Sequence, residues 1–237
     1  MNKLWKKFDV LTGKSYSNMV GAGEGFEVWN EAFAVLLDII SDGRGNDPDF
    51  ARELVDLDDS TDFEHDVCGW TEDYLDELDM RQEYEKLIEV CKKLLALFQW
   101  KEDSPSDLYF RIASSLGCLG KNKEALEFCE DWYGKEPESI QAAAALIYAR
   151  MGMKDLNGAE AVVKKYISQD TECSEDNDVI FIAAEILYKV KGDKKTEKRI
   201  TKALEKYDRE LEEYFNEIGA DEDFNFEDID DEELPFN

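Results

Sequence analysis

The stretch from residue 109 to residue 137 constrains the fold of this chain most, because its residues fall where two packed helices need them. A first apolar stripe at helical spacing consists of Tyr109, Ile112, Ala113 and Leu116. Gly120 follows as a helix stop signal, and Lys121 to Lys123 provide a turn. A second stripe consists of Ala125, Phe128, Cys129 and Trp132, and it ends before Pro137, which cannot continue a helix. The stretch therefore predicts a helix, a short turn and a second helix packed on the first.

Weaker copies of this helix pair are expected at a period of about 34 residues. Downstream, Ala144, Ala145 and Tyr148 precede Gly152 in the way that Ile112, Ala113 and Leu116 precede Gly120. This alignment predicts a longer turn in the second copy, with Lys154 to Asn157 as an insertion. A third copy is expected around Phe181, Ala184, Tyr188 and Gly192, and an upstream pair, which lacks the turn glycine, around residues 74–94.

The unit at 109–137 resembles one tetratricopeptide repeat. The resemblance implies an all-α fold, a right-handed α-α superhelix of about three to four helix pairs, whose concave face binds a protein or peptide. The residues that this resemblance places on the concave face are Phe110, Arg111, Ser114, Ala142, Ala143, Leu146, Arg150, Ile182, Ile186 and Lys189. Some relatives clamp the acidic end of chaperones there, but Phe110 and Ser114 stand where that clamp has a cation and an amide.

The three cations of this face leave two interpretations open. Arg111, Arg150 and Lys189 are spaced so that they can pair with carboxylates of an extended peptide. Alternatively, they form salt bridges with neighbouring acidic residues of the same chain. The sequence does not decide between a binding role and a structural one.

Outside the repeats, the sequence predicts a cap at each end and a tail. Residues 1–60 are expected to form a helical amino-terminal cap, with one helix from Glu24 to Ile40 closed by Gly43 and Gly45, and a shorter one through Phe50, Leu54 and Leu57. Residues 61–216 hold the repeats, and 202–218 are expected to cap their far end. Residues 217–237 form an acidic tail that we expect to be disordered alone.

The tail carries a second resemblance, formed by Asp230, Asp231, Leu234, Pro235 and Phe236. It is similar to the acidic tip of bacterial single-stranded DNA-binding proteins, although Asn237 displaces the terminal carboxylate by one residue. The resemblance implies an alternative function, in which the tail is a docking or mimic segment for a nucleic-acid-processing protein. In a variant, the tail folds back on the cations of the groove and inhibits it.

Charge and cysteine content bound the partners and the compartment. The 237 residues carry a formal net charge of -29, which repels phosphate backbones and anionic lipids. We therefore expect no direct nucleic acid and no membrane among the partners. The five cysteines contain no Cys-x-x-Cys pair, and no apolar run reaches the roughly 20 residues of a membrane helix, so a cytoplasmic location is expected.

No catalytic constellation is visible in the sequence. His65 is the only histidine, and although Glu64, Asp66 and Cys68 lie beside it, the pattern lacks a convergent metal ligand set or a nucleophile and base pair. We interpret His65 as a surface residue of the acidic turn 56–66. The sequence thus predicts a non-catalytic interaction scaffold without cofactor or metal, and it leaves the oligomeric state open.

Overall fold

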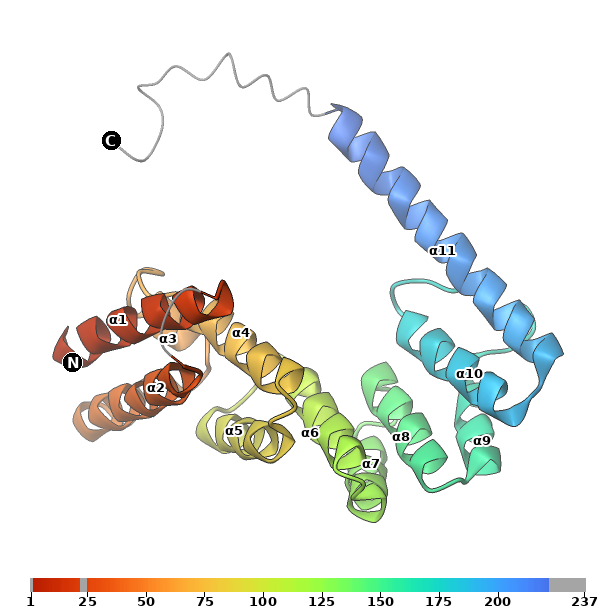
Figure 1. Ribbon diagram of the computed structural model, residues 1–237, viewed down its shortest axis with the longest axis horizontal. Helices are drawn as coiled ribbons and strands as arrows, with labels where there is room; N and C mark the ends of the chain where they lie inside the picture. The colour runs from red at the N-terminus through yellow and green to blue at the C-terminus, as the bar shows by residue number, and fades with distance from the viewer. Residues whose placement is uncertain (1, 22–24, 222–237) are drawn as a thin grey trace. The chain divides into compact units, whose positions relative to one another are not determined.

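The computed structural model describes residues 2–21 and 25–221, in which every regular element is a helix (Figure 1). The helices are α1 (Asn2–Met19), α2 (Glu27–Asn46), α3 (Asp56–Asp59), α4 (Val67–Met80), α5 (Tyr84–Leu97), α6 (Ser106–Cys118), α7 (Asn122–Lys135), α8 (Ile140–Gly152), α9 (Leu156–Tyr166), α10 (Asp178–Lys191) and α11 (Lys194–Asp221). The predicted all-α class is therefore confirmed for the described residues.

The chain divides into two compact units, Met1–Pro137 and Glu138–Asn237. Unit 1 contains α1 to α7, and unit 2 contains α8 to α11. The division follows Pro137, within the range 61–216 that the sequence assigns to the repeats.

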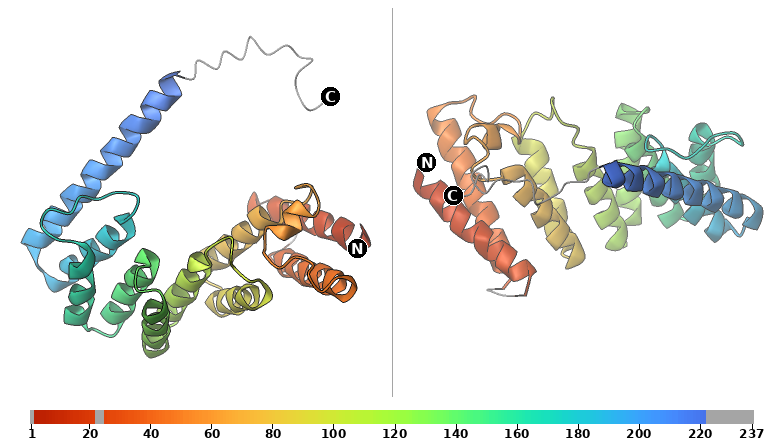
Figure 2. Two further views of the ribbon diagram at one scale, coloured as in Figure 1. Left: turned by 180° about the vertical axis from the view of Figure 1, so that it is seen from behind. Right: turned by 90° about the horizontal axis from the view of Figure 1, so that it is seen from above.

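An aromatic core fills the amino-terminal part of unit 1, where α1 lies along α2 (Figures 1 and 2). Phe8 of α1 is fully buried, and its ring centroid lies 5.2 Å from that of Trp70 in α4. Trp70 in turn stacks on Trp29 of α2 at 5.8 Å and on Tyr74 at 5.4 Å. Such aromatic pairs each contribute about 0.5–1.5 kcal/mol beyond their buried area. The sequence patterns predicted no helix before residue 24, so α1 is an addition to the predicted cap.

The end of α2 differs from the prediction. Gly43 and Gly45 were expected to close this helix near Ile40, but it continues to Asn46. A Cβ atom at Gly43 would overlap the ring of Phe50, whereas one at Gly45 would meet nothing within 4 Å. Gly43 is therefore required for the close approach of Phe50, and it does not act as a helix stop.

The predicted helix through Phe50, Leu54 and Leu57 is wrong in extent, since only the four residues of α3 are helical here. Ala51 has a φ of 47°, so the backbone leaves the right-handed helical region at this point. The Arg44 guanidinium holds the segment in its irregular path. It donates hydrogen bonds to the carbonyl oxygens of Phe50 at 3.2 Å, Ala51 at 2.6 Å and Leu97 at 2.8 Å.

Four helix hairpins in the described part of the chain close with the same turn: α4–α5, α6–α7, α8–α9 and α10–α11. In each turn one residue has a left-handed backbone, namely Gln82, Gly120, Lys154 or Gly192. The next residue donates its N–H to the carbonyl five positions back, as Lys121 does to Leu116 at 2.9 Å and Asp155 to Arg150 at 2.9 Å. This is the Schellman arrangement of a helix end, and it makes the four hairpins locally equivalent.

The equivalence of the turns corrects the alignment of the second copy. Lys154 and not Gly152 corresponds to Gly120, at a spacing of 34 residues, and Gly152 is the last residue of α8. The turns are therefore equal in length, and the predicted insertion at Lys154 to Asn157 is wrong. The chain varies instead between hairpins, where 98–105 and 167–177 are longer connections than 136–139.

Candidate functional site

A line of exposed aliphatic side chains on α10 is the candidate site. Helix α10 packs against α8, α9 and α11 in unit 2, and its covered face contains Phe181, Ala184 and Leu187. On its other face Ile182, Ile186 and Val190 are 43%, 40% and 58% exposed. Because they follow one another at steps of four residues, they form a single row, which we name the α10 stripe. Contiguous exposed apolar surface of this kind marks sites of interaction.

Polar contacts with α9 and α11 hold α10 in place. Lys191 Nζ lies 2.6 Å from Glu160 Oε2 of α9, and Lys164 Nζ lies 3.0 Å from the other oxygen of the same carboxylate. Hydrogen bonds from Lys191 and then Lys164 lower the pKa of Glu160 below its ordinary value. On the other side, the Thr201 hydroxyl of α11 donates to Glu185. The α10 stripe therefore lies on a helix that is anchored on two sides.

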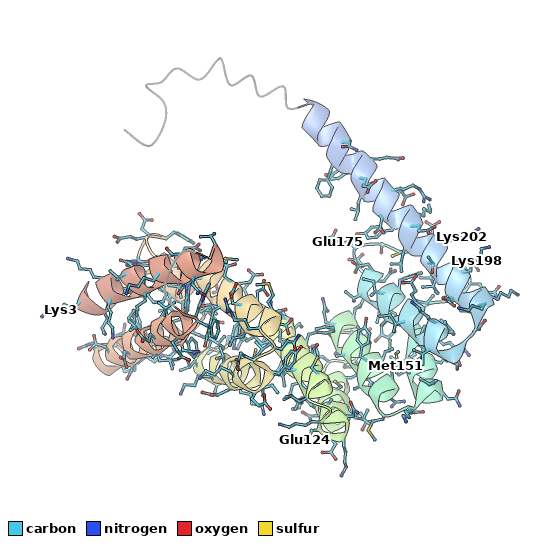
Figure 3. All side chains as sticks on the ribbon, in the orientation of Figure 1. Lys3, Glu124, Met151, Glu175, Lys198 and Lys202 are labelled. Atoms are coloured by element: carbon cyan, nitrogen blue, oxygen red, sulfur yellow. The ribbon has the colours of Figure 1, made fainter. Side chains whose placement is uncertain are left out.

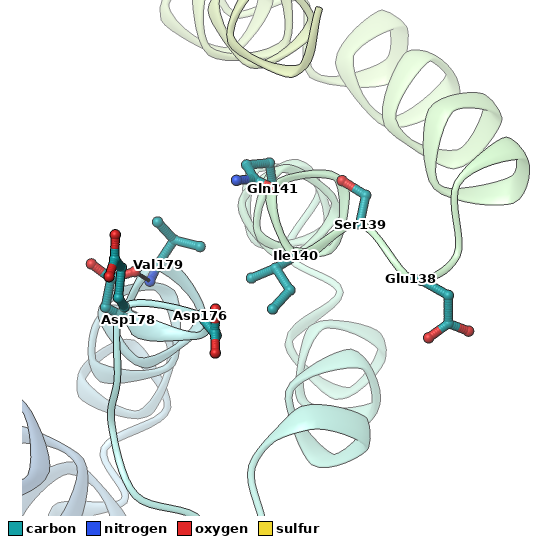
Figure 4. Close-up of a pocket in the computed structure, with 8 residues that line it drawn as sticks. Glu138, Ser139, Ile140, Gln141, Asp176, Asp178 and Val179 are labelled. Atoms are coloured by element: carbon teal, nitrogen blue, oxygen red, sulfur yellow. Dashed lines mark hydrogen bonds between the residues drawn. The ribbon is translucent and has the colours of Figure 1, made fainter. Parts of the chain in front are cut away.

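A cleft of about 380 Å³ lies at the amino-terminal ends of α8 and α10 (Figure 4). Its lining residues are Glu138, Ser139, Ile140, Gln141, Glu175, Asp176, Asp178 and Val179. Val179 is three residues before Ile182 on the same helix, so the apolar row continues into the cleft. Figure 4 shows Asp176 and Asp178 on the α10 side, opposite Ile140 and Gln141 of α8.

The charges along α10 give the candidate site a direction. Acidic residues of the cleft, including Asp176 and Asp178, lie at the beginning of the helix, whereas the exposed Lys189 lies in its last turn. A ligand with apolar side chains in the middle, a cation at one end and a carboxylate at the other would match this order. The arrangement suits binding of a segment of protein.

Comparisons of the chain with protein-family models, with curated proteins and with solved structures found no match. Within residues 2–21 and 25–221, no helix combines the length and the apolar character needed to cross a membrane. The same described residues contain no group of three His, Cys, Asp or Glu side chains placed to hold a metal ion.

Of the residues predicted for the concave face, those in unit 1 lie on α6. Phe110 is half-buried and Ser114 is exposed. Arg111 is largely covered, with 17% of its side chain exposed, and it lies 2.7 Å from Asp76 of α4 and 2.6 Å from Asp107. Burial alone would lower the pKa of Arg111, but these two carboxylates raise it above its ordinary value. Arg111 therefore ties α6 to α4, as the structural interpretation expects.

The predicted residues on α8 are mostly covered. Ala142, Ala143 and Leu146 are buried, since this helix is apolar almost all round and packs on more than one side. Arg150 is half-buried, and its Nη1 lies 3.8 Å from Asp155 Oδ2 in the following turn. The α8 residues thus offer little surface to a partner in this structure.

The predicted residues on α10 behave differently, because Ile182, Ile186 and Lys189 are all exposed. The resemblance did not include Val179 and Val190, which extend the same row at helical spacing. The i, i+3 and i+4 pattern around Ile182 and Ile186 is the signal that identifies them. The tail residues Asp230, Asp231, Leu234, Pro235 and Phe236 lie outside the described residues.

His65 is not a surface residue, contrary to the prediction. Its side chain is only 7% exposed and stacks on Trp5 of α1, with ring centroids 4.3 Å apart and planes 6° from parallel. Its Nδ1 lies 2.6 Å from Asp9 Oδ1. His65 therefore attaches the turn before α4 to α1, a role that the sequence did not reveal because both partners are more than fifty residues away.

Proposed function

We propose that this protein is a non-catalytic interaction scaffold built from tetratricopeptide-like helix hairpins, and that it binds a segment of a partner protein along the α10 stripe. The observation that carries the proposal is the row of Ile182, Ile186 and Val190, which are 40–58% exposed on an otherwise well-packed helix. A scaffold gains nothing in its own stability from three branched aliphatic residues in water, whereas a partner that covers them gains about 25 cal/mol per Å².

The repeated hairpin turn supports the scaffold part of the proposal. Hairpins with equal turns present their first helices in an equivalent way, which is the basis of binding surfaces in repeat proteins. The family resemblance also implies a superhelix with one continuous groove. Binding along the α10 stripe does not require that groove, because the stripe lies within unit 2, in which α8 to α11 are packed together.

The proposed partner segment is amphipathic and has a defined orientation. Its apolar side chains cover the α10 stripe and Val179, a Lys or Arg lies by Asp176 and Asp178, and a carboxylate reaches Lys189. We propose the cytoplasm as the place of this interaction. The five cysteines, all within the described residues, are free thiols, as is usual in a reducing compartment.

Site-specific photo-crosslinking tests this function. A photoreactive amino acid replaces Ile186 in the full chain, in its native cells, and mass spectrometry identifies the segment that becomes attached. The matched control carries the same amino acid at Ala161, which is exposed on α9. We expect one partner segment to attach at position 186 and not at position 161.

A binding measurement with the identified segment completes the test. The double variant Ile182→Lys and Ile186→Lys should bind the purified segment at least about tenfold more weakly, a loss of about 1.4 kcal/mol. The variant Ala161→Lys, which also adds positive charge to an exposed helical position, should bind it like the natural protein. Identical products at positions 186 and 161, or unchanged affinity in the double variant, would remove the α10 stripe as the binding site.

A further inference from the structure

Helix α11 continues well beyond the part that α10 covers (Figure 1). Five of its apolar residues follow one another at alternating steps of four and three along the sequence, and they are Ile200, Leu204, Tyr207, Leu211 and Tyr214. This is the heptad spacing of a helix that pairs with another helix along a narrow seam. We name residues 204–215 the α11 seam.

The burial of these apolar residues decreases toward the carboxyl-terminal end of α11. Ile200 is fully buried against unit 2, Tyr207 and Leu211 are half-buried, and Tyr214 is 58% exposed. Phe215, beside Tyr214, is 65% exposed. The first turns of α11 thus close the end of unit 2, whereas the cap predicted at 202–218 includes Tyr214 and, beside the apolar row, Phe215, which remain open to solvent.

The charges of α11 change sign along its length. The amino-terminal part, residues 194–202, carries Lys194, Lys195, Lys198, Arg199 and Lys202 against one acidic residue, Glu197; Lys198 and Lys202 are labelled in Figure 3. The later part, residues 203–216, carries Glu205, Asp208, Glu210, Glu212 and Glu213 against two basic residues, Lys206 and Arg209. This order opposes the helix dipole, which favours acidic residues at the beginning and basic residues at the end by about 0.3–1 kcal/mol each.

The charges beside the seam exclude three possible occupants: a second copy of α11, the chain's own acidic tail and an anionic lipid surface. In the heptad frame of Leu204 to Tyr214, the positions beside the seam are Ala203, Asp208, Glu210 and Phe215, so none of them is basic. Two α11 helices from two copies of the chain would therefore lack opposite charges where such pairs need them. The chain's own tail contributes ten acidic residues and no basic one between 217 and 233. An anionic lipid surface is repelled for the same reason.

We propose that the α11 seam binds an amphipathic helix of a partner protein that carries Lys or Arg on both sides of its apolar stripe. Tyr214 and Phe215 are the aromatic anchors of this contact. Asp208 pairs with one basic flank, and Glu210, whose Oε1 lies 3.5 Å from Lys206 Nζ in the same helix, pairs with the other. The partner's cations also offset the unfavourable order of charges along α11. This surface is separate from the α10 stripe and needs a different partner chemistry.

Two designed peptides of about three heptads test the inference against the full chain. Both carry Leu at the seam positions; one has Lys at the flanking positions and the other has Glu. Fluorescence anisotropy measures their binding to the natural protein, to the double variant Tyr214→Ser and Phe215→Ser, and to the control Val10→Ser. Val10 of α1 is 60% exposed and Tyr214 is 58% exposed, and all three substitutions leave the net charge unchanged.

We expect the Lys peptide to bind the natural protein and the Val10→Ser control equally, and the double variant at least about tenfold more weakly. The Glu peptide should not bind. Equal binding of the Lys peptide to the double variant would overturn the proposal, because the attraction would then come from net charge alone. Sedimentation of the full chain gives a second decisive result: self-association that the double variant abolishes would overturn the proposal by identifying a second copy as the occupant.

Discussion

The two terminal helices, each considered within its own unit, show the same apolar pattern with opposite outcomes. In α1, Trp5, Phe8 and Leu11 are at most 8% exposed, because aromatic residues of α2 and α4 and the turn at His65 cover them. In α11, the row begins fully buried at Ile200 and reaches Tyr214 and Phe215, which are more than half exposed. Amphipathic spacing therefore specifies which face of a helix is apolar, and it does not specify whether that face is covered.

The difference separates a capping helix from one that both caps and presents a surface. A terminal repeat needs a cover for its apolar face, and α1 provides one through the buried Trp5, Phe8 and Leu11, while Val10, Tyr16 and Met19 are exposed on its other positions. Helix α11 covers α10 with its first turns only. Its later turns combine exposed aromatic side chains with a run of acidic residues, which is a pattern suited to a partner and not to a core.

The largest expected effect comes from a pair of identical substitutions at the two helices. Phe8→Ala removes a fully buried ring and should lower the free energy of unfolding of unit 1 by about 3–5 kcal/mol. Phe215→Ala removes a ring that is 65% exposed and should change the stability of unit 2 by less than about 0.5 kcal/mol. Equal losses of stability in the two variants would contradict the description of α1 as a covered helix and of the end of α11 as an open one.

Denaturant unfolding measures the two changes separately. All five tryptophans lie in unit 1, between Trp5 and Trp132, so tryptophan fluorescence reports the unfolding of that unit. Circular dichroism at helical wavelengths reports both units and therefore includes α11. The Phe8→Ala change should move the fluorescence transition to lower denaturant, whereas Phe215→Ala should leave both signals unchanged.

The close contact at the end of α2 gives the next effect. Gly43→Ala places a methyl group against the Phe50 ring, and the necessary shift should lower the stability of unit 1 by about 1–3 kcal/mol. Gly45→Ala is the matched control, since it lies in the same helix with open space around it, and it should be neutral or stabilising. The same fluorescence measurement applies, and a neutral Gly43→Ala would show that Phe50 is not held against α2.

The helix pairs were largely predictable from the sequence, whereas their surroundings were not. Apolar stripes such as Tyr109 to Leu116 report which residues share a face, so α6, α7 and α10 were expected close to their observed positions. Helix α1 was missed because its three buried apolar residues, Trp5, Phe8 and Leu11, alternate with lysines and other polar residues, and the partner Trp70 is distant in sequence. The turn at Lys154 was misaligned because a lysine occupies a left-handed position that usually belongs to glycine.

The residues of the candidate site were likewise only partly predictable from the sequence. The family resemblance indicated Ile182, Ile186 and Lys189, and these are exposed, but it also indicated Ala142 and Leu146, which are buried. Exposure depends on how many neighbours a helix has, and this is a property of the folded unit. Arg111 illustrates the limit for charged residues, because its partner Asp76 lies on the preceding hairpin and no local pattern connects the two.

A smaller effect tests the link between α1 and the turn before α4. His65→Ala removes the stack on Trp5 and the contact with Asp9, and it should lower the stability of unit 1 by about 1–2 kcal/mol. His65→Phe keeps an aromatic ring on Trp5 and should recover part of that loss. Fluorescence-detected unfolding distinguishes the variants, and a phenylalanine no better than alanine would mean that the contact with Asp9 carries the whole effect.

The smallest effect concerns the hairpin turns. Here backbone strain should affect the stability of the two units in the same way. Gln82→Gly relieves a left-handed backbone at the α4–α5 turn of unit 1 and should stabilise that unit by about 0.5–1 kcal/mol. Gly192→Ala introduces the corresponding strain at the α10–α11 turn of unit 2 and should destabilise it by about 1 kcal/mol. The same Schellman hydrogen bond closes both turns, so the signs should be opposite and the sizes similar. If Gly192→Ala left the circular dichroism transition unchanged, α11 would not depend on its hairpin turn. The hairpin turns of the two units would then differ in their contribution to stability.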